Sequence, residues 1–344
     1  MKQLNIAKEK QSFLPKNLGK LTVILLILLI LSIIASIAFG SRSIGWSTIL
    51  DGLFHPELND HESSVVRQRV VRTIFSFMCG AALGVSGALM QSVTRNPIAD
   101  PSILGVNTGA ALFVVSGIAF FNISSASEYV WLAIAGAILT AIFVFTIGSL
   151  GGSGATPLKL VLAGAATSAI LSSLVTAIMI PRQNVMDQFR FWQVGSVGAG
   201  TWDSIQLLLP FLVVGIIIAI LATPALNAMA LGDEVATGLG VKTGTIRLVS
   251  AFAGVLLCGA ATAFAGPIGF IGLLATHVIR LMIGPDLRFI IPLSALSGGI
   301  ILTISDVVGR LIARPGEVEV GILTAFIGAP ILIYITMKAK MRSL

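Results

Sequence analysis

Long runs of apolar residues, separated by short polar breaks, occupy almost the whole chain. A helix needs about 20 apolar residues to cross the hydrocarbon core of a bilayer. Runs of this kind predict helices over roughly 21–40, 70–92, 104–121, 128–149, 158–180, 205–223, 247–264, 270–283, 289–311 and 320–337. The pattern therefore predicts an all-α, polytopic membrane bundle of about ten transmembrane helices.

Turn-forming residues mark the breaks between these runs, for example at Asn96-Pro97 and Gly284-Pro285. The run over 270–283 is short and lies between Gly and Pro residues, which predicts a broken or partial span. Gly80 and Gly84 form a GxxxG step, a spacing that lets helix backbones approach closely. We expect a single transmembrane domain over 21–338, with tails at 1–20 and 339–344.

Composition supports a membrane protein over a soluble one. Of the 344 residues, 56% are hydrophobic and only 11% are charged, whereas a soluble domain carries about 25% charged residues. The mean hydropathy of +0.98 agrees. The two cysteines, Cys79 and Cys258, lie inside apolar runs, so we expect buried small side chains and neither a disulfide nor a metal site.

Charge is concentrated near the ends of the chain. Basic residues flank membrane spans on the cytoplasmic side, and an even number of spans returns both termini to that side. The net charge of +7 is therefore assigned to membrane topology and not to nucleic acid. The residues that carry this argument are Lys2, Lys8, Lys10, Lys16, Lys20, Lys338, Lys340 and Arg342.

The opposite side collects arginines and no lysine. Such arginines can lie along helix ends and satisfy terminal carbonyls, or they can form a docking surface for an acidic partner. The residues alone leave both interpretations open.

The chain carries no nucleotide site of the P-loop type. The nearest candidate, 238–244, lacks the Gly that should precede Lys242. A separate subunit must therefore hydrolyse ATP if ATP drives this protein. Ion-coupled carriers usually hold ionisable groups at mid-membrane, and the predicted spans contain few, among them Asp306, Arg310 and His277. An ion-coupled carrier is therefore disfavoured but stays an alternative.

The segment 225–247 is too long for a tight turn. Gly232 and Gly240 divide it into two short helical stretches, and Asp233 and Glu234 suit the first turn of a helix. It is either an ordinary cytosolic loop or an element that couples the bundle to a motor subunit.

Six sequence blocks, taken together, resemble a known family. The chain is similar to the iron-siderophore and cobalamin permeases, the FecCD-like transmembrane subunits of type II ABC importers. The blocks run in family order and cover most of the chain from about residue 67 onward. They are RVVRT with 80–110, FWQVGS, ALGDEVATGLG, 266–286, DVVGR and VGILTAFIGAP.

The resemblance implies a dimer of ten-span permeases, with a second copy or a related chain as partner. It also implies two ATP-binding subunits and an extracytoplasmic siderophore-binding protein or lipoprotein, in a bacterial cytoplasmic membrane. The chain would contact lipid, catalyse no covalent step and bind no cofactor or metal, since ATP and Mg would be used by the partner ATPase.

The resemblance also assigns candidate site residues. Family members dock their binding protein on arginines that correspond here to Arg69, Arg72 and Arg310. Where the family has Leu-Pro, this chain has Val70-Val71, so the start of the second helix can differ. Coupling to the ATPase is assigned to Leu231, Gly232, Glu234, Ala236, Leu239 and Gly240. A translocation gate is assigned to Asn96, Ile98, Thr156 and Pro157.

We therefore expect the permease subunit of an ATP-driven, binding-protein-dependent importer of iron(III)-siderophore complexes. Cobalamin or haem stays open as cargo because permeases for all three share these blocks. An ion-coupled secondary transporter and a membrane receptor without transport are the alternatives of a different class.

Overall fold

The computed structural model describes residues 17–55, 60–123, 126–150 and 156–342. Within these ranges the protein is helical and contains no strand. The expected all-α class is confirmed. The helices are α1 (Leu18–Ala38), α2 (Trp46–Phe54), α3 (His61–Thr94), the short 3-10 helix η1 (Pro101–Leu104), α4 (Val106–Phe121), α5 (Ala126–Ser149), α6 (Pro157–Met179), α7 (Gln183–Gln193), α8 (Trp202–Ala230), α9 (Asp233–Gly238), α10 (Thr243–Ala265), α11 (Ile271–Ile283), α12 (Leu287–Ile312) and α13 (Val320–Arg342).

Each predicted run is occupied by a helix. Seven helices in the described part are long and apolar enough to cross a membrane, and α4, α11 and the apolar part of α13 are shorter. The expected short helix over 270–283 is thus found as α11. The amphipathic helices α2 and α7 were not predicted, because neither forms a long apolar run.

Two boundaries differ from expectation for local reasons. α3 begins at His61, well before residue 70, because the side chain of Asp60 accepts a hydrogen bond from the backbone N–H of Ser63 at 3.1 Å. Arg69 and Arg72 consequently lie within this helix and not ahead of it. Two short helical stretches were expected in the segment 225–247. The first of them is the last part of α8, which continues through Pro224 to Ala230.

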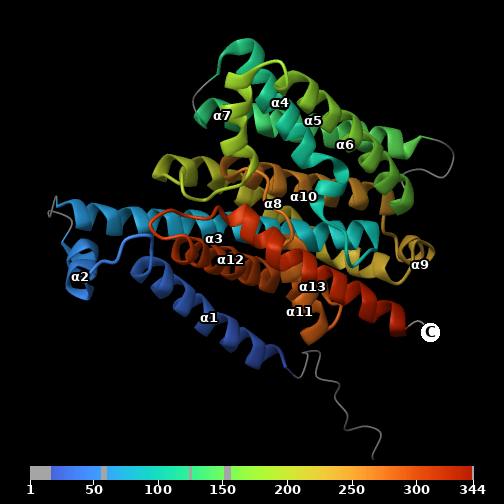
Figure 1. Ribbon diagram of the computed structural model, residues 1–344. Helices are drawn as coiled ribbons and strands as arrows, with labels where there is room; N and C mark the ends of the chain where they lie inside the picture. Colours follow the sequence, from blue (N-terminus) through green and yellow to red (C-terminus); the bar gives the residue numbers. More distant parts are fainter. Residues whose placement is uncertain (1–16, 56–59, 124–125, 151–155, 343–344) are drawn as a thin grey trace, which may run out of the picture.

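α3 lies at the centre of the bundle, between α12, α10 and α11 (Figure 1). Glycines allow α3 to occupy this position, because they let the neighbouring helices approach it closely. A side chain on Gly80 would overlap the backbone of Gly298, and one on Gly84 would overlap that of Ser294. The GxxxG step therefore mediates helix packing, as its spacing predicts. Cys79 and Cys258 are buried and free, as expected.

The outer surface of several helices is apolar. On α1 the side chains of Val23, Ile27, Ile30 and Ile34 are exposed, although they belong to a strongly hydrophobic helix. Water would not favour such a surface, whereas lipid or a partner helix would. This arrangement fits a membrane-embedded bundle.

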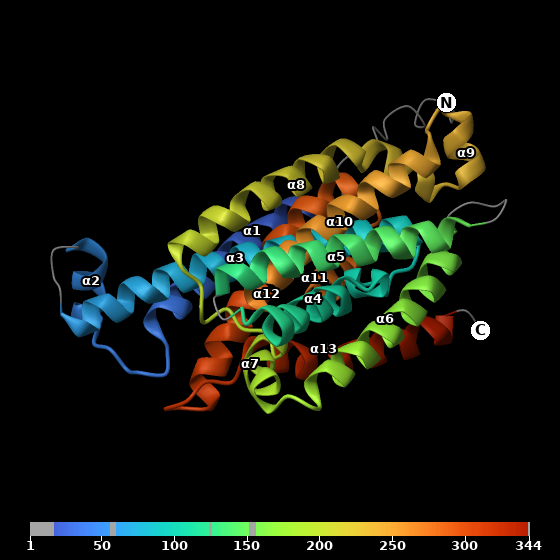
Figure 2. The same ribbon diagram turned by 90° about the horizontal axis from the view of Figure 1, so that it is seen from above.

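The two ends of the bundle differ. Figures 1 and 2 show α2 and the start of α3 at one end and α9 at the other. In both views α1 begins and α13 ends toward the end of the bundle at which α9 lies. The cytoplasmic placement of the two termini stays a prediction. Residues 1–16 of the predicted tail 1–20 and the loop 151–155 lie outside the described residues.

Candidate functional site

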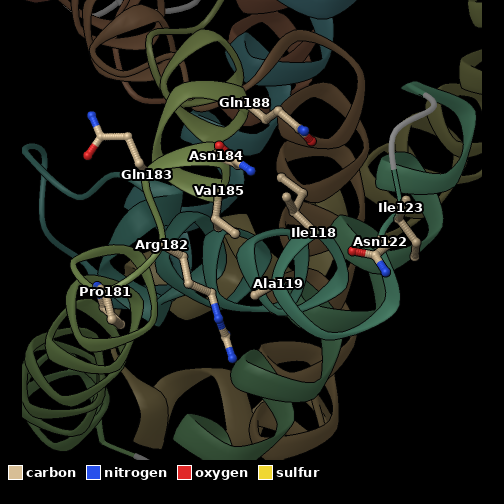
Figure 3. A pocket seen from close by; sticks show the side chains of 10 residues that line it. All are labelled: Ile118, Ala119, Asn122, Ile123, Pro181, Arg182, Gln183, Asn184, Val185 and Gln188. Atoms are coloured by element: carbon tan, nitrogen blue, oxygen red, sulfur yellow. The ribbon is translucent and has the colours of Figure 1, made fainter.

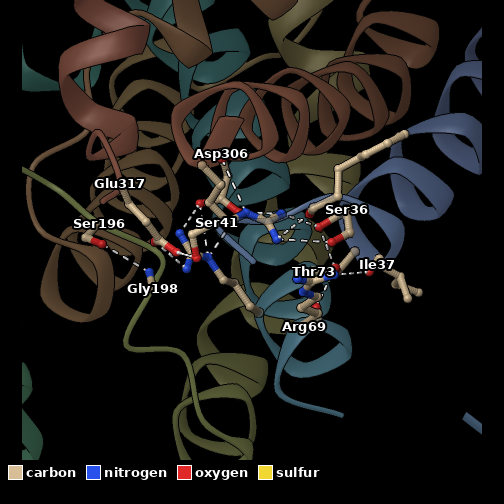
Figure 4. Close-up of polar contacts among 12 residues, drawn as sticks. Ser36, Ile37, Ser41, Arg69, Thr73, Ser196, Gly198, Asp306 and Glu317 are labelled. Atoms are coloured by element: carbon tan, nitrogen blue, oxygen red, sulfur yellow. Dashed lines mark hydrogen bonds and ion pairs between the residues drawn. The ribbon is translucent and has the colours of Figure 1, made fainter. Parts of the chain in front are cut away.

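A cluster of charged side chains, most of them buried, joins α3 to α12 (Figure 4). It lies near the start of α3, at the end of the bundle away from α9. Asp306 lies between two arginines: its carboxylate is 2.6 Å from Nη2 of Arg72 and 3.0 Å from Nη2 of Arg310. Arg72 also pairs with Glu317, at 2.8 Å. We call Arg69, Arg72, Arg310, Asp306 and Glu317 the arginine cluster.

Two of these arginines hold the end of α1. Arg310, with its side chain only 2% exposed, donates to the carbonyls of Ser36 and Phe39, each at 3.1 Å. Arg69 donates to the carbonyls of Ile37 at 3.0 Å and Ala38 at 3.1 Å. The last carbonyls of a helix lack partners within it and carry partial negative charge, so guanidinium groups stabilise them. The interpretation that arginines satisfy helix ends therefore holds for both.

The cluster also borders a cavity of about 300 Å³. All three predicted docking arginines line it, together with Arg42, and Glu317 is the one acidic side chain among its described lining residues. The charge balance of this arginine cavity favours a negatively charged ligand. Its described lining residues are Gly40, Ser41, Arg42, His61, Val65, Gln68, Arg69, Arg72, Gly198, Gly200, Arg310 and Glu317.

Glu317 is held as a carboxylate. Burial alone would raise the pKa of Glu317, but the Coulombic field of Arg72 and hydrogen bonds from Arg72 and Ser41 lower it, and the net direction is downward. The arginine cavity therefore already contains one ionised acid of the chain itself.

A second polar cluster lies at the α9 end. Asp233, the first residue of α9, pairs with Arg95 at 2.6 Å and with Arg247 at 3.2 Å. Arg95 also donates to the carbonyl of Met229 at 2.6 Å. It ends α3 in a left-handed conformation, with φ of 50°. Asp233 thus ties α9 to the end of α3 and to the start of α10.

The predicted coupling residues form the projecting part of this region. Leu231 and Leu239 are 70% and 66% exposed, and Val235 between them is also exposed. Ala236 is fully buried and anchors α9 on the bundle. Gly232 and Gly240 have φ of 125° and 82°, which residues with a side chain rarely adopt. Glu234 lies exposed in the first turn.

The predicted gate residues lie in the turn that follows α3 and at the start of α6. Asn96 follows α3, and its side-chain oxygen accepts from the backbone N–H of Ile98 at 3.1 Å. Thr156 caps α6 by accepting from the N–H of Lys159 at 3.4 Å, and Pro157 is the first residue of that helix. Ala155 lies outside the described residues. These contacts give Asn96 a role in the turn after α3 and Thr156 a role as the cap of α6, and the gate stays a prediction.

A larger cavity, of about 490 Å³, lies between the ends of α4 and α6 and the start of α7 (Figure 3). Its polar lining consists of the amides of Asn122, Gln183, Asn184 and Gln188 and of Arg182. The guanidinium of Arg182 stacks 4.6 Å from the ring centroid of Phe120.

The model of the FecCD transport family matches residues 27–338. The chain belongs to the FecCD transport family. The resemblance drawn from the six sequence blocks is thereby confirmed, and the protein is a multi-span membrane protein of an ABC transporter permease family of the cell membrane.

Several curated proteins resemble this FecCD-family chain over nearly its whole length. It is 40% identical to the ferric enterobactin transport system permease of Escherichia coli (strain K12), over 91% of this chain and 94% of that protein. It is 38% identical to the iron(3+)-hydroxamate import system permease of Bacillus subtilis (strain 168), over 98% and 89%. It is also similar to the solved inward-facing structure of a metal-chelate type ABC transporter, with TM-score 0.80, 25% identity and coverage of 93% and 99%.

Sequence reasoning missed two contributors to these sites. Glu317 lies 245 residues from Arg72, so no local spacing relates them; the sequence signal was only an acid directly after the Pro315-Gly316 break. Nothing in the sequence indicated that Arg95 pairs with Asp233. The i, i+4 spacing of Asp306 and Arg310 permits a pair on one helix, and the structure contains this pair.

Proposed function

We propose that this FecCD-family chain is the permease subunit of an ATP-driven importer that moves iron(III)-siderophore complexes across a bacterial cytoplasmic membrane. Its partners would be a second permease copy or related chain, two ATP-binding subunits and an extracytoplasmic binding protein. ATP and Mg would be used by the ATP-binding subunits, and this chain would contribute conformational change and no covalent chemistry. The observation that carries the proposal is that α9 and the arginine cavity lie at opposite ends of one bundle.

The α9 end supports contact with a motor subunit. Leu231 at the end of α8, Val235 within α9 and Leu239 directly after α9 are exposed, and we call these three side chains the apolar stripe. Exposed apolar side chains beside polar residues suit a hydrophobic groove on a partner. Because Asp233 pairs with Arg95 and Arg247, a force on this stripe would reach α3 and α10 directly.

The arginine cavity supports docking of an acidic partner, and its three predicted docking arginines have different roles. Arg69 and Arg310 brace α1 and supply positive charge from buried positions. Arg72, whose side chain is 15% exposed, is the predicted docking arginine best placed for direct contact. A carboxylate on the binding protein would pair with it in a partly desolvated site, where charge-assisted hydrogen bonds are strong.

The exposed side chains of α6 support the proposal that a translocation path runs beside this helix. Ala165, Ala169, Ser172 and Thr176 lie on one face of this helix and are exposed. Small and hydroxyl-bearing side chains do not need lipid, in contrast to the exposed Val and Ile residues of α1. A wide path lined by such residues suits a large soluble chelate, and the gate expected at Asn96, Ile98, Thr156 and Pro157 lies in the segments that lead into η1 and α6.

The iron-siderophore cargo rests on the relatives, which are named for ferric enterobactin, hydroxamate and citrate import. Cobalamin or haem is the alternative within this class. The test is uptake of ⁵⁵Fe in cells that lack their own siderophore permeases and receive this chain with its host's ATP-binding and binding proteins. Uptake should require all three and be lost when the ATP-binding subunit cannot hydrolyse ATP. Uptake of labelled cobalamin or haem in place of ⁵⁵Fe-siderophore would overturn the cargo.

A further inference from the structure

Glu317 makes two contacts at the rim of the arginine cavity. Its Oε2 accepts from Nη1 of Arg72 at 2.8 Å, and its Oε1 accepts from Oγ of Ser41 at 3.1 Å (Figure 4). It belongs to the segment 313–319 between α12 and α13, and its side chain is 32% exposed. It is therefore an accessible acid on a connecting segment.

Asp306 differs from Glu317 in burial and in role. Its side chain is 3% exposed and accepts from both Nε and Nη2 of Arg72, at 3.1 and 2.6 Å, while it also pairs with Arg310. These bonds fix the position of Arg72 without help from Glu317. Removing the carboxylate of Glu317 would thus free Nη1 of Arg72 but leave the guanidinium in place.

The positive charge of the cavity favours a carboxylate beside Arg72. Four arginines line the cavity, against Glu317 in the lining and the buried Asp306 that pairs with Arg72 and Arg310. Positive charge therefore remains in excess, and a carboxylate at Nη1 of Arg72 is favoured whether it comes from this chain or from a partner. Two carboxylates cannot both occupy that position because they would repel each other at hydrogen-bonding distance.

We propose that Glu317 occupies the carboxylate site of the arginine cavity in the undocked protein and is displaced from Arg72 by an acidic side chain of the docking binding protein. This inference rests on the proposed function. Glu317 is then an internal competitor that keeps docking weak enough for the emptied binding protein to leave, and it determines the affinity without itself contacting cargo.

If Glu317 competes for Arg72, removing its carboxylate should increase the affinity of the binding protein for the permease. A partly exposed ion pair stabilises a protein by about 1 kcal/mol at most, which corresponds to about fivefold in a binding constant. Glu317→Gln keeps the size of the side chain and its contact with Ser41 but removes the charge. Damage to the fold would weaken docking, so tighter docking is a readout that a purely structural role of Glu317 would not produce.

The test is the Kd of docking, measured by biolayer interferometry on the complete importer in lipid nanodiscs. The probe is the binding protein that supports ⁵⁵Fe uptake in the cellular assay above. We expect Glu317→Gln to bind about fivefold tighter, Glu317→Asp to stay close to the unmodified protein, and Arg72→Gln to bind more weakly. Glu319→Gln is the matched control, since it removes the same charge from the same segment away from the cavity lining, and it should change little.

The possible failures are distinguishable. If Glu317→Gln binds with unchanged or weaker affinity while Arg72→Gln weakens binding, the displacement of Glu317 is wrong but docking at the arginine cavity stands. If neither variant changes an otherwise measurable affinity, docking at this cavity is wrong as well. If the unmodified protein does not bind the probe, the proposed function fails and the inference fails with it.

Discussion

The carboxylate of Asp233 lies 2.6 Å from the guanidinium of Arg95 and thereby connects the first residue of α9 to the residue at which α3 ends. α3 is the central helix of the bundle, and Asn96 and Ile98 follow directly on it. The segment that we expect to meet a motor subunit is thus joined by one ion pair to the segment that we expect to gate the path.

Loss of this ion pair should uncouple ATP hydrolysis from transport. In Asp233→Asn the bonds to Arg95 and Arg247 weaken, but both groups of the first pair are more than a third exposed, so we expect a stability loss of no more than about 1 kcal/mol. The number of ⁵⁵Fe-siderophore complexes imported per ATP hydrolysed should fall several-fold. Asp187→Asn, an exposed acid on α7, is the control; an unchanged ratio in Asp233→Asn would argue against coupling through this pair.

The apolar stripe on the α9 segment should be required for assembly and not for folding. Leu231→Ser combined with Leu239→Ser removes two side chains that are mostly exposed, so thermal stability should change by less than about 0.5 kcal/mol per site. Retention of the ATP-binding subunit during purification should drop sharply. Thr237→Ser, which keeps the exposed surface of α9, should retain it, and full retention by the double variant would contradict the coupling role.

Close packing around α3 should tolerate no added side chain at Gly84. A Cβ there would overlap the backbone of Ser294, so Gly84→Ala should destabilise the protein by about 1–3 kcal/mol. Gly19→Ala is the matched control, because nothing lies within 4 Å of a Cβ at that helical position. Thermal unfolding in detergent should separate the two, and equal midpoints would show that the α3–α12 contact is looser than described.

The two acids of the arginine cluster should differ in their effect on stability. Asp306→Asn leaves Arg310, almost fully buried, without its charged partner, and breaking a buried ion pair costs about 3–5 kcal/mol. Glu317→Gln should cost far less, because its side chain is partly exposed. The comparison is the yield and the unfolding midpoint of each variant. Similar losses for the two would mean that Asp306 does not carry the structural role assigned to it.

The stability contribution of Glu317 should depend on pH with a defined sign. Its pKa is lower in the folded protein than the ordinary value of 4.5, so folding favours the ionised form. The stability difference between the unmodified protein and Glu317→Gln should be fully present above about pH 4.5 and should disappear as the pH falls through the lowered pKa. A difference that grows on acidification would contradict the pairing with Arg72.

Long apolar runs were sufficient to place the apolar helices, because lipid requires such runs with internally satisfied backbones. They could not place the start of α3, where the Asp60 cap extends the helix into a polar sequence, and they could not predict α7. The candidate arginines were located by resemblance. That these arginines both stabilise helix ends and line the cavity could not be predicted. The contacts of Arg310 with α1 and of Arg72 with Glu317 join residues far apart in the chain and follow from tertiary packing alone.

On the proposed function, this chain provides the path and depends on ATP hydrolysed by its partners. The most direct measurement is flux of a ⁵⁵Fe-siderophore complex into proteoliposomes that contain the chain, its ATP-binding subunit and its binding protein, with ATP supplied to the ATPase side. We predict flux that requires hydrolysable ATP and that ceases without the binding protein. Equal flux driven by a proton or sodium gradient, in liposomes that contain this chain alone, would contradict the account.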